Sequence, residues 1–219
     1  MSAVKSKRVP RAVREQQMLD AAVRTFAVRG YRAASMDDIA ELAGVSKPLV
    51  YLYLNSKEEL FSACIRRESA ALISAVRAAA EPGLAEGFPA DRQLWNGLRG
   101  FFAHTAEHPN SWAVLHQQAR TQGEPFACEV AVMRAELVDL VTQLIAAAAR
   151  EADCDRELAE REVSGLAHAL VGAAESLTEW AGEAEGQGPS AKETALTLMN
   201  FAWAGLESLM SGRRWSPGQ

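Results

Sequence analysis

The chain has 219 residues, of which 48% are hydrophobic, enough for a substantial core in one or two domains. No run of about 18 apolar residues occurs, so the sequence excludes a membrane-spanning helix. The net charge of −5 is unevenly divided, because residues 1–57 carry ten Lys and Arg against five Asp and Glu, while the remainder carries 13 against 23.

This charge division favours a protein that binds a polyanion with one end only, since a uniformly acidic chain would bind nucleic acid poorly. The first 16 residues, MSAVKSKRVPRAVREQ, lack the apolar segment of a secretory signal. The cysteines are odd in number and widely spaced, which argues against a disulfide framework and against a zinc site: Cys64, Cys128 and Cys154. We therefore expect a cytoplasmic protein without a metal or cofactor.

The first predicted helix spans about Pro10 to Arg29. Its apolar residues recur at helical spacing and should form one buried stripe, which comprises Leu19, Ala22, Val23 and Phe26. Gly30 is expected to end this helix.

Two short helices joined by a glycine turn are predicted in the window from Ser35 to Phe61. Ser35 is a good N-cap, with Asp38 at the capping-box position three residues later. Gly44 closes that helix because glycine enters the left-handed conformation cheaply. Ser46 then caps a second helix, and Pro48 falls in its first turn. This order is typical of a helix-turn-helix unit.

A long fourth helix should begin at Ser56, with Glu59 at the box position, and run to about Ala80. The segment Glu81–Pro89 is a break with two prolines and two glycines. Beyond it we expect five further helices and no strand, which gives an all-α fold of about nine helices. Their approximate bounds are Asp91–Glu107, Asn110–Thr121, Pro125–Glu151, Asp155–Gly182 and Ser190–Ser211.

The window and its flanks resemble the DNA-binding domain of the TetR family of bacterial regulators. The matching residues are Phe26, Gly30-Tyr31, Met36 to Ala40, Gly44-Val45-Ser46, Tyr51 and Ser56 to Leu60. The resemblance implies an N-terminal three-helix DNA-binding domain with a basic arm, residues 1–57. It also implies a helical ligand-binding and dimerisation domain, residues 58–219, joined to the first through the long helix four.

The expected DNA contacts lie in and around the second helix of this unit: Ser35, Ser46, Lys47, Pro48, Leu49, Tyr51, Tyr53 and Lys57. Lys47 is the candidate for a guanine contact, whereas Pro48 and Leu49 offer only apolar contact, for example with a thymine methyl group. The tyrosine hydroxyls and Lys57 suit phosphate oxygens, and the resemblance implies the same.

For each of these residues a role other than DNA contact stays open. Tyr51 could be a core aromatic, Tyr53 could pack against the first helix, and Lys47 could be merely solvated. The basic arm from Lys5 to Arg14 either follows an adjacent minor groove or is a disordered tail. Val45, Val50 and Leu54 are expected to face inward.

A helix-turn-helix reads few base pairs, so the body should form a homodimer. The last two helices carry small and apolar residues suited to close helix packing, and the resemblance implies a four-helix interface from them. The candidates are Ala169, Gly172, Ala173, Ser176, Phe201, Gly205, Leu206 and Leu209. The alternative is an ordinary intrachain core.

The middle helices carry aromatic residues with a few polar groups among them, which describes a small-molecule site, and the family is similar in this respect. The alternative is again a plain core. The candidates are Trp95, Phe102, His104, Trp112, His116, Met133, Leu137, His168 and Glu175.

These features predict a ligand-responsive transcriptional regulator, most simply a repressor that binds a palindromic operator in double-stranded DNA and is released by a small, largely apolar effector. A non-specific or architectural DNA-binding protein without a ligand is the alternative. A helical enzyme is disfavoured, because the sequence has no HExxH, GxSxG, P-loop or Gly-rich dinucleotide turn.

Overall fold

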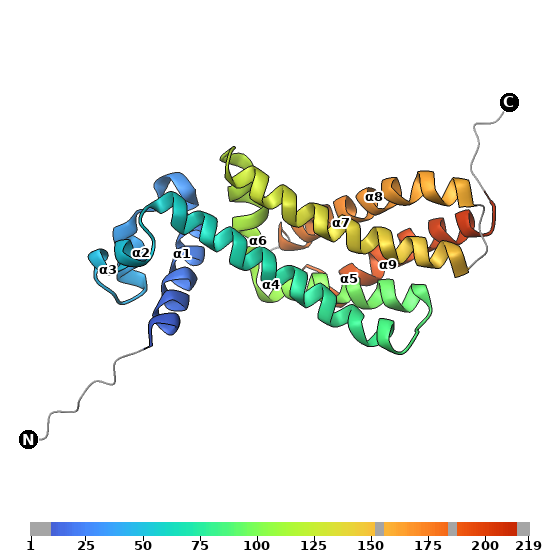
Figure 1. Ribbon diagram of the computed structural model, residues 1–219, viewed down its shortest axis with the longest axis horizontal. Coiled ribbons are helices and arrows are strands. Elements are labelled where there is room, and N and C mark those ends of the chain that lie inside the picture. The colour runs from blue at the N-terminus through green and yellow to red at the C-terminus, as the bar shows by residue number, and fades with distance from the viewer. Residues whose placement is uncertain (1–9, 152–155, 184–187, 214–219) are drawn as a thin grey trace, which may run out of the picture. The chain divides into compact units, whose positions relative to one another are not determined.

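The computed structural model describes residues 10–151, 156–183 and 188–213 (Figure 1). Cys154 and the part of the predicted basic arm that precedes Pro10 lie outside these residues. Within them the chain forms nine α-helices and one short π-helical stretch, η1, which confirms the predicted all-α fold. The bounds are α1 Arg11–Ala33, α2 Met36–Leu42, α3 Lys47–Tyr53, α4 Lys57–Ala85, α5 Ala90–Glu107, α6 Pro109–Trp112, η1 Ala113–Ala119, α7 Phe126–Glu151, α8 Arg156–Glu183 and α9 Ala191–Met210.

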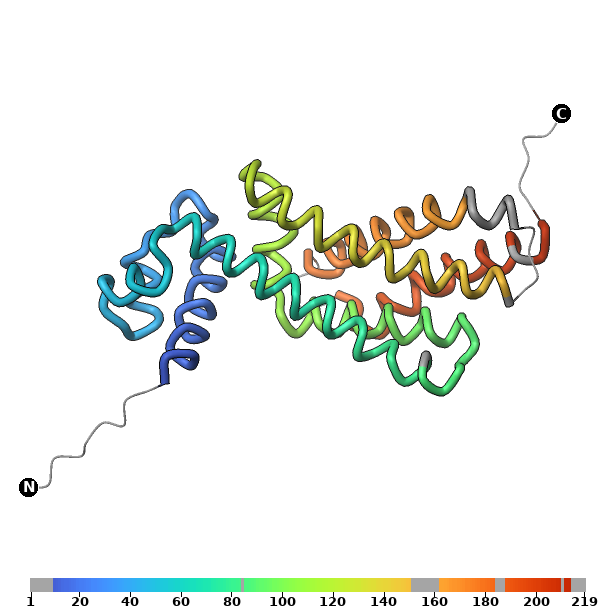
Figure 2. Tube along the Cα trace, viewed as in Figure 1, coloured from blue at the N-terminus to red at the C-terminus, as the bar shows by residue number. Residues whose placement is uncertain are grey.

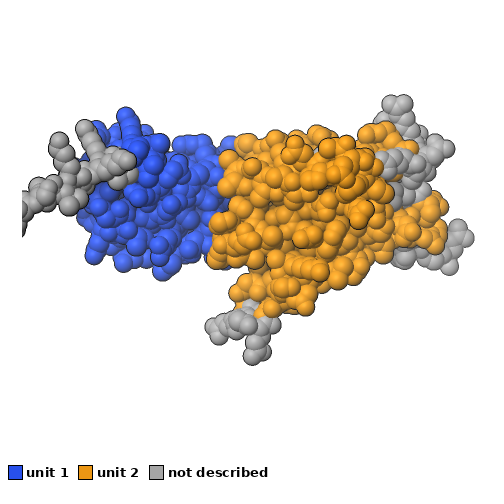
Figure 3. Space-filling model, turned by 90° about the horizontal axis from the view of Figure 1, so that it is seen from below, with its two compact units in different colours: residues 1–69, 110–130 blue, residues 70–109, 131–219 orange. Residues whose placement is uncertain are grey.

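The chain divides into two compact units (Figure 3). Unit 1 comprises residues 1–69 and 110–130, and unit 2 comprises residues 70–109 and 131–219. The division falls inside α4 and again inside α7. The units are defined by contacts, and the functional boundary at residue 57 stays a prediction.

The core of unit 1 is built on the predicted stripe of α1, all of which is buried. Phe26 meets Phe61 of α4 edge-on, with ring centroids 4.8 Å apart. Phe126, at the start of α7, lies 4.8 Å from Phe61 and 5.2 Å from Tyr31. Four aromatic rings therefore join α1 to α4 and α7, and they explain why a segment beyond residue 110 belongs to the same unit as the helix-turn-helix.

α1 continues past Gly30 to Ala33, although the sequence predicted its end at that glycine. Gly30 nevertheless interrupts the helical geometry, with φ 77° and ψ 158°. The side-chain amide oxygen of Gln118, in η1, accepts a hydrogen bond from the Tyr31 N–H at 3.2 Å. That partner satisfies a backbone donor that the break at Gly30 leaves without a helical acceptor.

α4 runs to Ala85 rather than to about Ala80, with Pro82 inside its last turns. Gly83 is buried, and a Cβ atom there would meet Gln93 at 3.3 Å and Phe88 at 3.4 Å. The predicted break at Glu81–Pro89 is therefore shorter, because the helix continues through Pro82 and Gly83 to Ala85. The predicted helix Asn110–Thr121 also differs, because α6 passes into the π-helical η1, for which the sequence carries no simple signal.

Unit 2 is a helical bundle in which α9 packs against α5 and α8, and α5 also packs against α8 (Figure 2). The start of α9 is fixed by a capping box between Ser190 and Glu193. None of the helices, within the described residues, is long and apolar enough to cross a membrane.

Candidate nucleic-acid interface and ligand cavity

The start of α2 is fixed by a capping box, as predicted. The Ser35 hydroxyl accepts from the Asp38 N–H at 3.1 Å, and the Asp38 carboxylate accepts from the Ser35 N–H at 3.2 Å. Arg29 of α1 forms an ion pair with the same carboxylate at 2.8 Å. The Ser35 hydroxyl also donates to the Asp38 carboxylate at 2.7 Å, and this hydrogen bond, with that from the Ser35 N–H and the charge of Arg29, holds the pKa of Asp38 below its ordinary value. The box therefore ties α2 to α1.

The turn between α2 and α3 is built as the sequence predicts. Gly44 adopts φ 66°, the left-handed region that favours glycine. Ser46 is the N-cap residue of α3, and Pro48 lies in the first turn. Ser46 is exposed, and its hydroxyl makes no capping hydrogen bond, which leaves that oxygen available to an external partner.

α3 packs inward through Val50, which is fully buried, while Val45 and Leu54 are half-buried. Lys47 is exposed and pairs with Asp37 of α2 at 2.8 Å, and this hydrogen bond raises the pKa of Lys47. Pro48 is exposed and Leu49 is half-buried.

The two tyrosines of α3 occupy different settings. Tyr51 is 41% exposed, so it is not a core aromatic. Tyr53 is half-buried, with the Arg11 guanidinium of α1 5.0 Å from its ring centroid. That contact agrees with the alternative in which Tyr53 packs against the first helix.

Leu52 was not selected from the sequence, yet it is 73% exposed on α3. Helical spacing could have identified it, because Leu52 follows the inward-facing Val50 by two residues and therefore lies on the opposite side of the helix. The segment LVYLYL, however, is almost uniformly apolar, so its composition does not distinguish the exposed leucine from the buried residues.

Lys57 has a structural role that the sequence did not indicate. Its ammonium group donates to three backbone carbonyls at the end of α1 and beyond, those of Tyr31 at 2.9 Å, Arg32 at 3.2 Å and Ala34 at 3.0 Å. An ammonium group has three N–H donors, so these acceptors match its full capacity. Contact of Lys57 with a phosphate stays a prediction.

The N-cap of α4 is Ser56, whose hydroxyl accepts from the Glu59 N–H at 3.0 Å. The Glu59 carboxylate accepts from the Asn55 N–H at 3.1 Å instead of from Ser56. The predicted capping box is therefore incomplete, because the Glu59 carboxylate bonds the residue before the N-cap and not the N-cap itself. The two hydrogen bonds still fix the segment that leads from α3 to α4.

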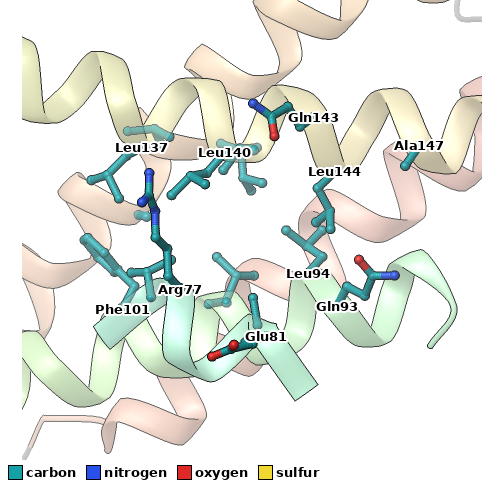
Figure 4. Close-up of a pocket in the computed structure, with 18 residues that line it drawn as sticks. Arg77, Glu81, Gln93, Leu94, Phe101, Leu137, Leu140, Gln143, Leu144 and Ala147 are labelled. Carbon is teal, nitrogen blue, oxygen red and sulfur yellow. The ribbon is translucent and has the colours of Figure 1, made fainter. Parts of the chain in front are cut away.

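Unit 2 contains a cavity of about 500 Å³ between α4, α5, α7 and α8 (Figure 4). Its walls are mainly aliphatic, with Leu94, Leu140 and Leu144 among them, and Phe101 adds an aromatic ring. Exposed polar side chains also line it, namely Arg77, Glu81 and Gln143. The volume and the lining are those of a small-molecule site.

Leu137 is the one member of the predicted ligand set among the described cavity-lining residues. Phe102 is buried beside Phe101, the ring that does line the cavity. Met133 is buried, and Glu175 forms an ion pair with Arg134 at 3.1 Å.

The remaining members of the ligand set are spread over both units. Trp112 and His116 stack in unit 1, with ring centroids 4.7 Å apart. In unit 2, His104 lies 4.6 Å from the ring of His108, and Trp95 lies beside the Arg99 guanidinium. His168 is exposed, with its Nδ1 2.8 Å from the Ser164 carbonyl oxygen. Aromatic residues close in sequence were therefore divided between two cores.

The predicted dimer residues lie on α8 and α9. On α8, Ala169 and Ser176 are exposed, and Gly172 and Ala173 are half-buried.

On α9, Phe201 is 78% exposed, Gly205 is exposed and Leu209 is half-buried. Leu206 is buried within its own unit, beside Leu94 of α5 and Trp203. An exposed phenylalanine beside small residues is consistent with a surface that another helix covers.

Among the described residues, no three His, Cys, Asp or Glu side chains are grouped so that they could hold a metal ion.

Comparison with known proteins gives matches over both units. The family profile "Bacterial regulatory proteins, tetR family" matches residues 18–64, and "Tetracyclin repressor-like, C-terminal domain" matches residues 90–205. The HTH-type transcriptional activator FasR of Mycolicibacterium smegmatis is 31% identical over 200 residues, which cover 91% of this chain and 85% of FasR.

Solved structures also match this chain over most of its length. A TetR-like transcriptional regulator from Rhodococcus sp. RHA1 is 39% identical, with a TM-score of 0.75 over 91% of this chain and 99% of that one. The fatty acid degradation regulator FadR from Bacillus halodurans shares the fold at 18% identity, with a TM-score of 0.76 over 92% of this chain and 98% of FadR.

Proposed function

The chain belongs to the TetR family of DNA-binding transcriptional regulators, and we propose that it binds a palindromic operator as a homodimer under the control of a small, largely apolar ligand. Members of this family regulate transcription and are not enzymes, so the enzyme alternative is set aside. A protein that acts on chromosomal DNA would work in the cytoplasm.

The observation that carries the proposal is the course of α4. Its first turns supply Leu60 and Phe61 to the core of unit 1, beside α1 of the DNA-binding unit. Later turns of the same helix supply Val76 and Ala80 to the cavity wall. A ligand that prefers one conformation of the cavity would shift the population of α4 conformations by its difference in affinity for the two states.

The ligand that suits the cavity has a long or bulky apolar part and a single polar end. The aliphatic walls favour burial of carbon, at roughly 25 cal/mol per Å² of apolar surface. The polar groups are few and include exposed side chains, which suits a ligand whose polar end stays near water.

The first experiment selects the operator from random DNA with the full chain. A symmetric site is expected, bound by two chains, and selection of no sequence would favour the alternative of a non-specific DNA-binding protein. The second experiment titrates small apolar molecules into the protein–operator complex and follows DNA release by fluorescence anisotropy.

A cavity-filling variant tests whether the cavity is the ligand site. Ala147 of α7 lines the cavity, and Ala147→Trp is expected to keep operator binding while losing the ligand response. Ala135→Trp, at an exposed position of the same helix, is the matched control and should respond as the native chain does. An unchanged response in Ala147→Trp would refute the site.

Repression is the mode that the sequence analysis predicted. Activation is a second candidate because the relative FasR, 31% identical, is an activator. In vitro transcription from a promoter beside the selected operator separates the two: the protein lowers transcript yield in one case and raises it in the other.

A further inference from the structure

The side of α3 that faces away from the core of unit 1 is apolar. Val50 is fully buried and marks the packing side of this helix. Successive helical residues are rotated by about 100°, so Pro48 and Leu52 lie about 160° and 200° from Val50. Both are exposed, Leu52 by 73%. These two residues, one turn apart, form what we name the apolar ridge.

Polar groups of α3 lie at the sides of the ridge rather than on it. Lys47 is about 60° from Val50 and Tyr51 about 100°, on the same side of the helix. Lys47 is held at that side by its ion pair with Asp37 of α2. The Tyr53 ring lies on the opposite flank, beside Arg11 of α1. A surface that faces the middle of α3 would therefore contact the apolar ridge before it contacted a charged side chain.

A single exposed leucine needs no special explanation. Here, however, the leucine lies beside an exposed proline and a 41% exposed tyrosine on the second helix of a helix-turn-helix. In such units that helix lies in the major groove, and only its face away from the packing side can enter. The apolar group at the base edges of the major groove is the C5-methyl of thymine.

We propose that Leu52, supported by Pro48, contacts a thymine methyl group in each operator half-site and determines the base preference there. The proposal rests on sequence-specific DNA binding as the function. It adds a specificity residue to those expected from the sequence and sets a requirement on the operator, which must place a thymine opposite Leu52. Burial of one methyl group corresponds to about a fourfold change in affinity.

The test uses the full chain and the operator that it selects. Each thymine in a half-site is replaced in turn by deoxyuridine, which removes the methyl group and keeps the base pair. In the native protein, replacement of one thymine in each half-site is expected to lower affinity about fourfold per half-site. In Leu52→Ala the same replacement is expected to have no further effect, while replacement of the other thymines acts as before.

Two control variants complete the experiment. Leu42→Ala removes a leucine that is 47% exposed on α2, and it should keep the full sensitivity to deoxyuridine. Leu52→Met keeps an apolar side chain of similar size and should keep most of it. Because Leu52 is exposed, both substitutions at this position should leave the helical circular dichroism unchanged.

The outcomes are separable. If the chain selects no sequence, the proposed function fails. If it selects an operator whose half-sites lack thymine, or if Leu52→Ala keeps the deoxyuridine effect, the proposal for Leu52 alone is refuted. A change of oligomeric state in Leu52→Ala without DNA would show that the ridge binds a second copy of the chain, which also refutes it.

Discussion

The ammonium group of Lys57 lies 2.9 Å from the carbonyl oxygen of Tyr31 and 4.7 Å from the centre of the same residue's ring. It also donates to the Arg32 and Ala34 carbonyls, so one side chain at the start of α4 satisfies the backbone that leaves α1. The Lys57 side chain is thus a bridge between two helices of the DNA-binding unit.

Replacement of Lys57 by methionine should therefore destabilise the protein without DNA. Hydrogen bonds to a charged group are worth about 1.5–3 kcal/mol, so we expect a loss of about that size. Urea unfolding followed by circular dichroism at fixed protein concentration measures it. Lys192→Met, at an exposed position of α9, is the matched control and should change stability little. Equal stabilities, with weaker binding to every DNA sequence, would support the phosphate contact instead.

Lys47 offers a contrasting prediction. Its ion pair with Asp37 is exposed and screened by water, so Lys47→Ala should leave stability nearly unchanged. If Lys47 reads a guanine, this variant loses about 1–3 kcal/mol of discrimination at one operator position. Competition binding with single-base operator variants measures the discrimination. A uniform loss over all variants, with a smaller salt dependence, would instead assign Lys47 to a phosphate.

The sequence was most informative where local chemistry decides structure. The Ser35 and Asp38 box, the left-handed Gly44 and the buried stripe of α1 follow from caps, glycine and helical spacing. The ligand side was different. Which aromatic residues share a core depends on contacts distant in the chain, and helical periodicity places Phe101 and Phe102 equally well. The cavity itself is lined mostly by leucine, valine and alanine, whose spacing in the sequence does not distinguish them from other core residues.

The role of Lys57 shows the same limit in the DNA-binding unit. A lysine at a helix N-terminus reads as a phosphate contact from sequence alone. Its three carbonyl partners arise only when α4 packs on the end of α1, more than 20 residues earlier in the chain. No local signal at Lys57 reports that packing.

The capping box at α2 predicts a dependence of stability on pH. Hydrogen bonds from Ser35 hold the pKa of Asp38 below its ordinary value of 3.8. Ionised Asp38 therefore stabilises the fold above the pKa of the unfolded chain, and this contribution is lost as pH falls through the lower pKa of the folded state. The stability difference between the native chain and Asp38→Asn should shrink on acidification from pH 6 to pH 3. Asp139→Asn, at an exposed position of α7, is the matched control for the removal of one carboxylate.

The two cysteines that the structure describes should differ sharply in reactivity. Cys64 is fully buried, with its Sγ 3.9 Å from the Leu19 carbonyl oxygen, and burial raises the pKa of its thiol to about 12. Cys128 is exposed. In a Cys154→Ser background, a thiol reagent such as 5,5′-dithiobis(2-nitrobenzoic acid) should modify Cys128 quickly and Cys64 only after unfolding. Adding Cys128→Ser should abolish the native reaction, and a fast residual reaction would contradict the burial of Cys64.

Gly100 of α5 packs closely against α4 in unit 2. A Cβ atom at Gly100 would lie 2.5 Å from the Ala79 Cβ and 3.1 Å from the Ala75 carbonyl oxygen. Neither atom belongs to a flexible side chain, so Gly100→Ala must push the two helices apart. Overpacking of this kind costs about 1–3 kcal/mol. Thermal unfolding should show the loss, and the cavity beside these helices should change its ligand affinity as well.

Gly97, three residues earlier on α5, is the control for this prediction. A Cβ atom there meets nothing within 4 Å. Replacing a glycine inside a helix by alanine otherwise stabilises the helix by about 0.5–1 kcal/mol. We therefore expect opposite signs, with Gly97→Ala more stable and Gly100→Ala less stable than the native chain. If both variants gained stability, α4 and α5 would not approach as closely as the structure shows, because the helix propensity of alanine acts equally at both positions.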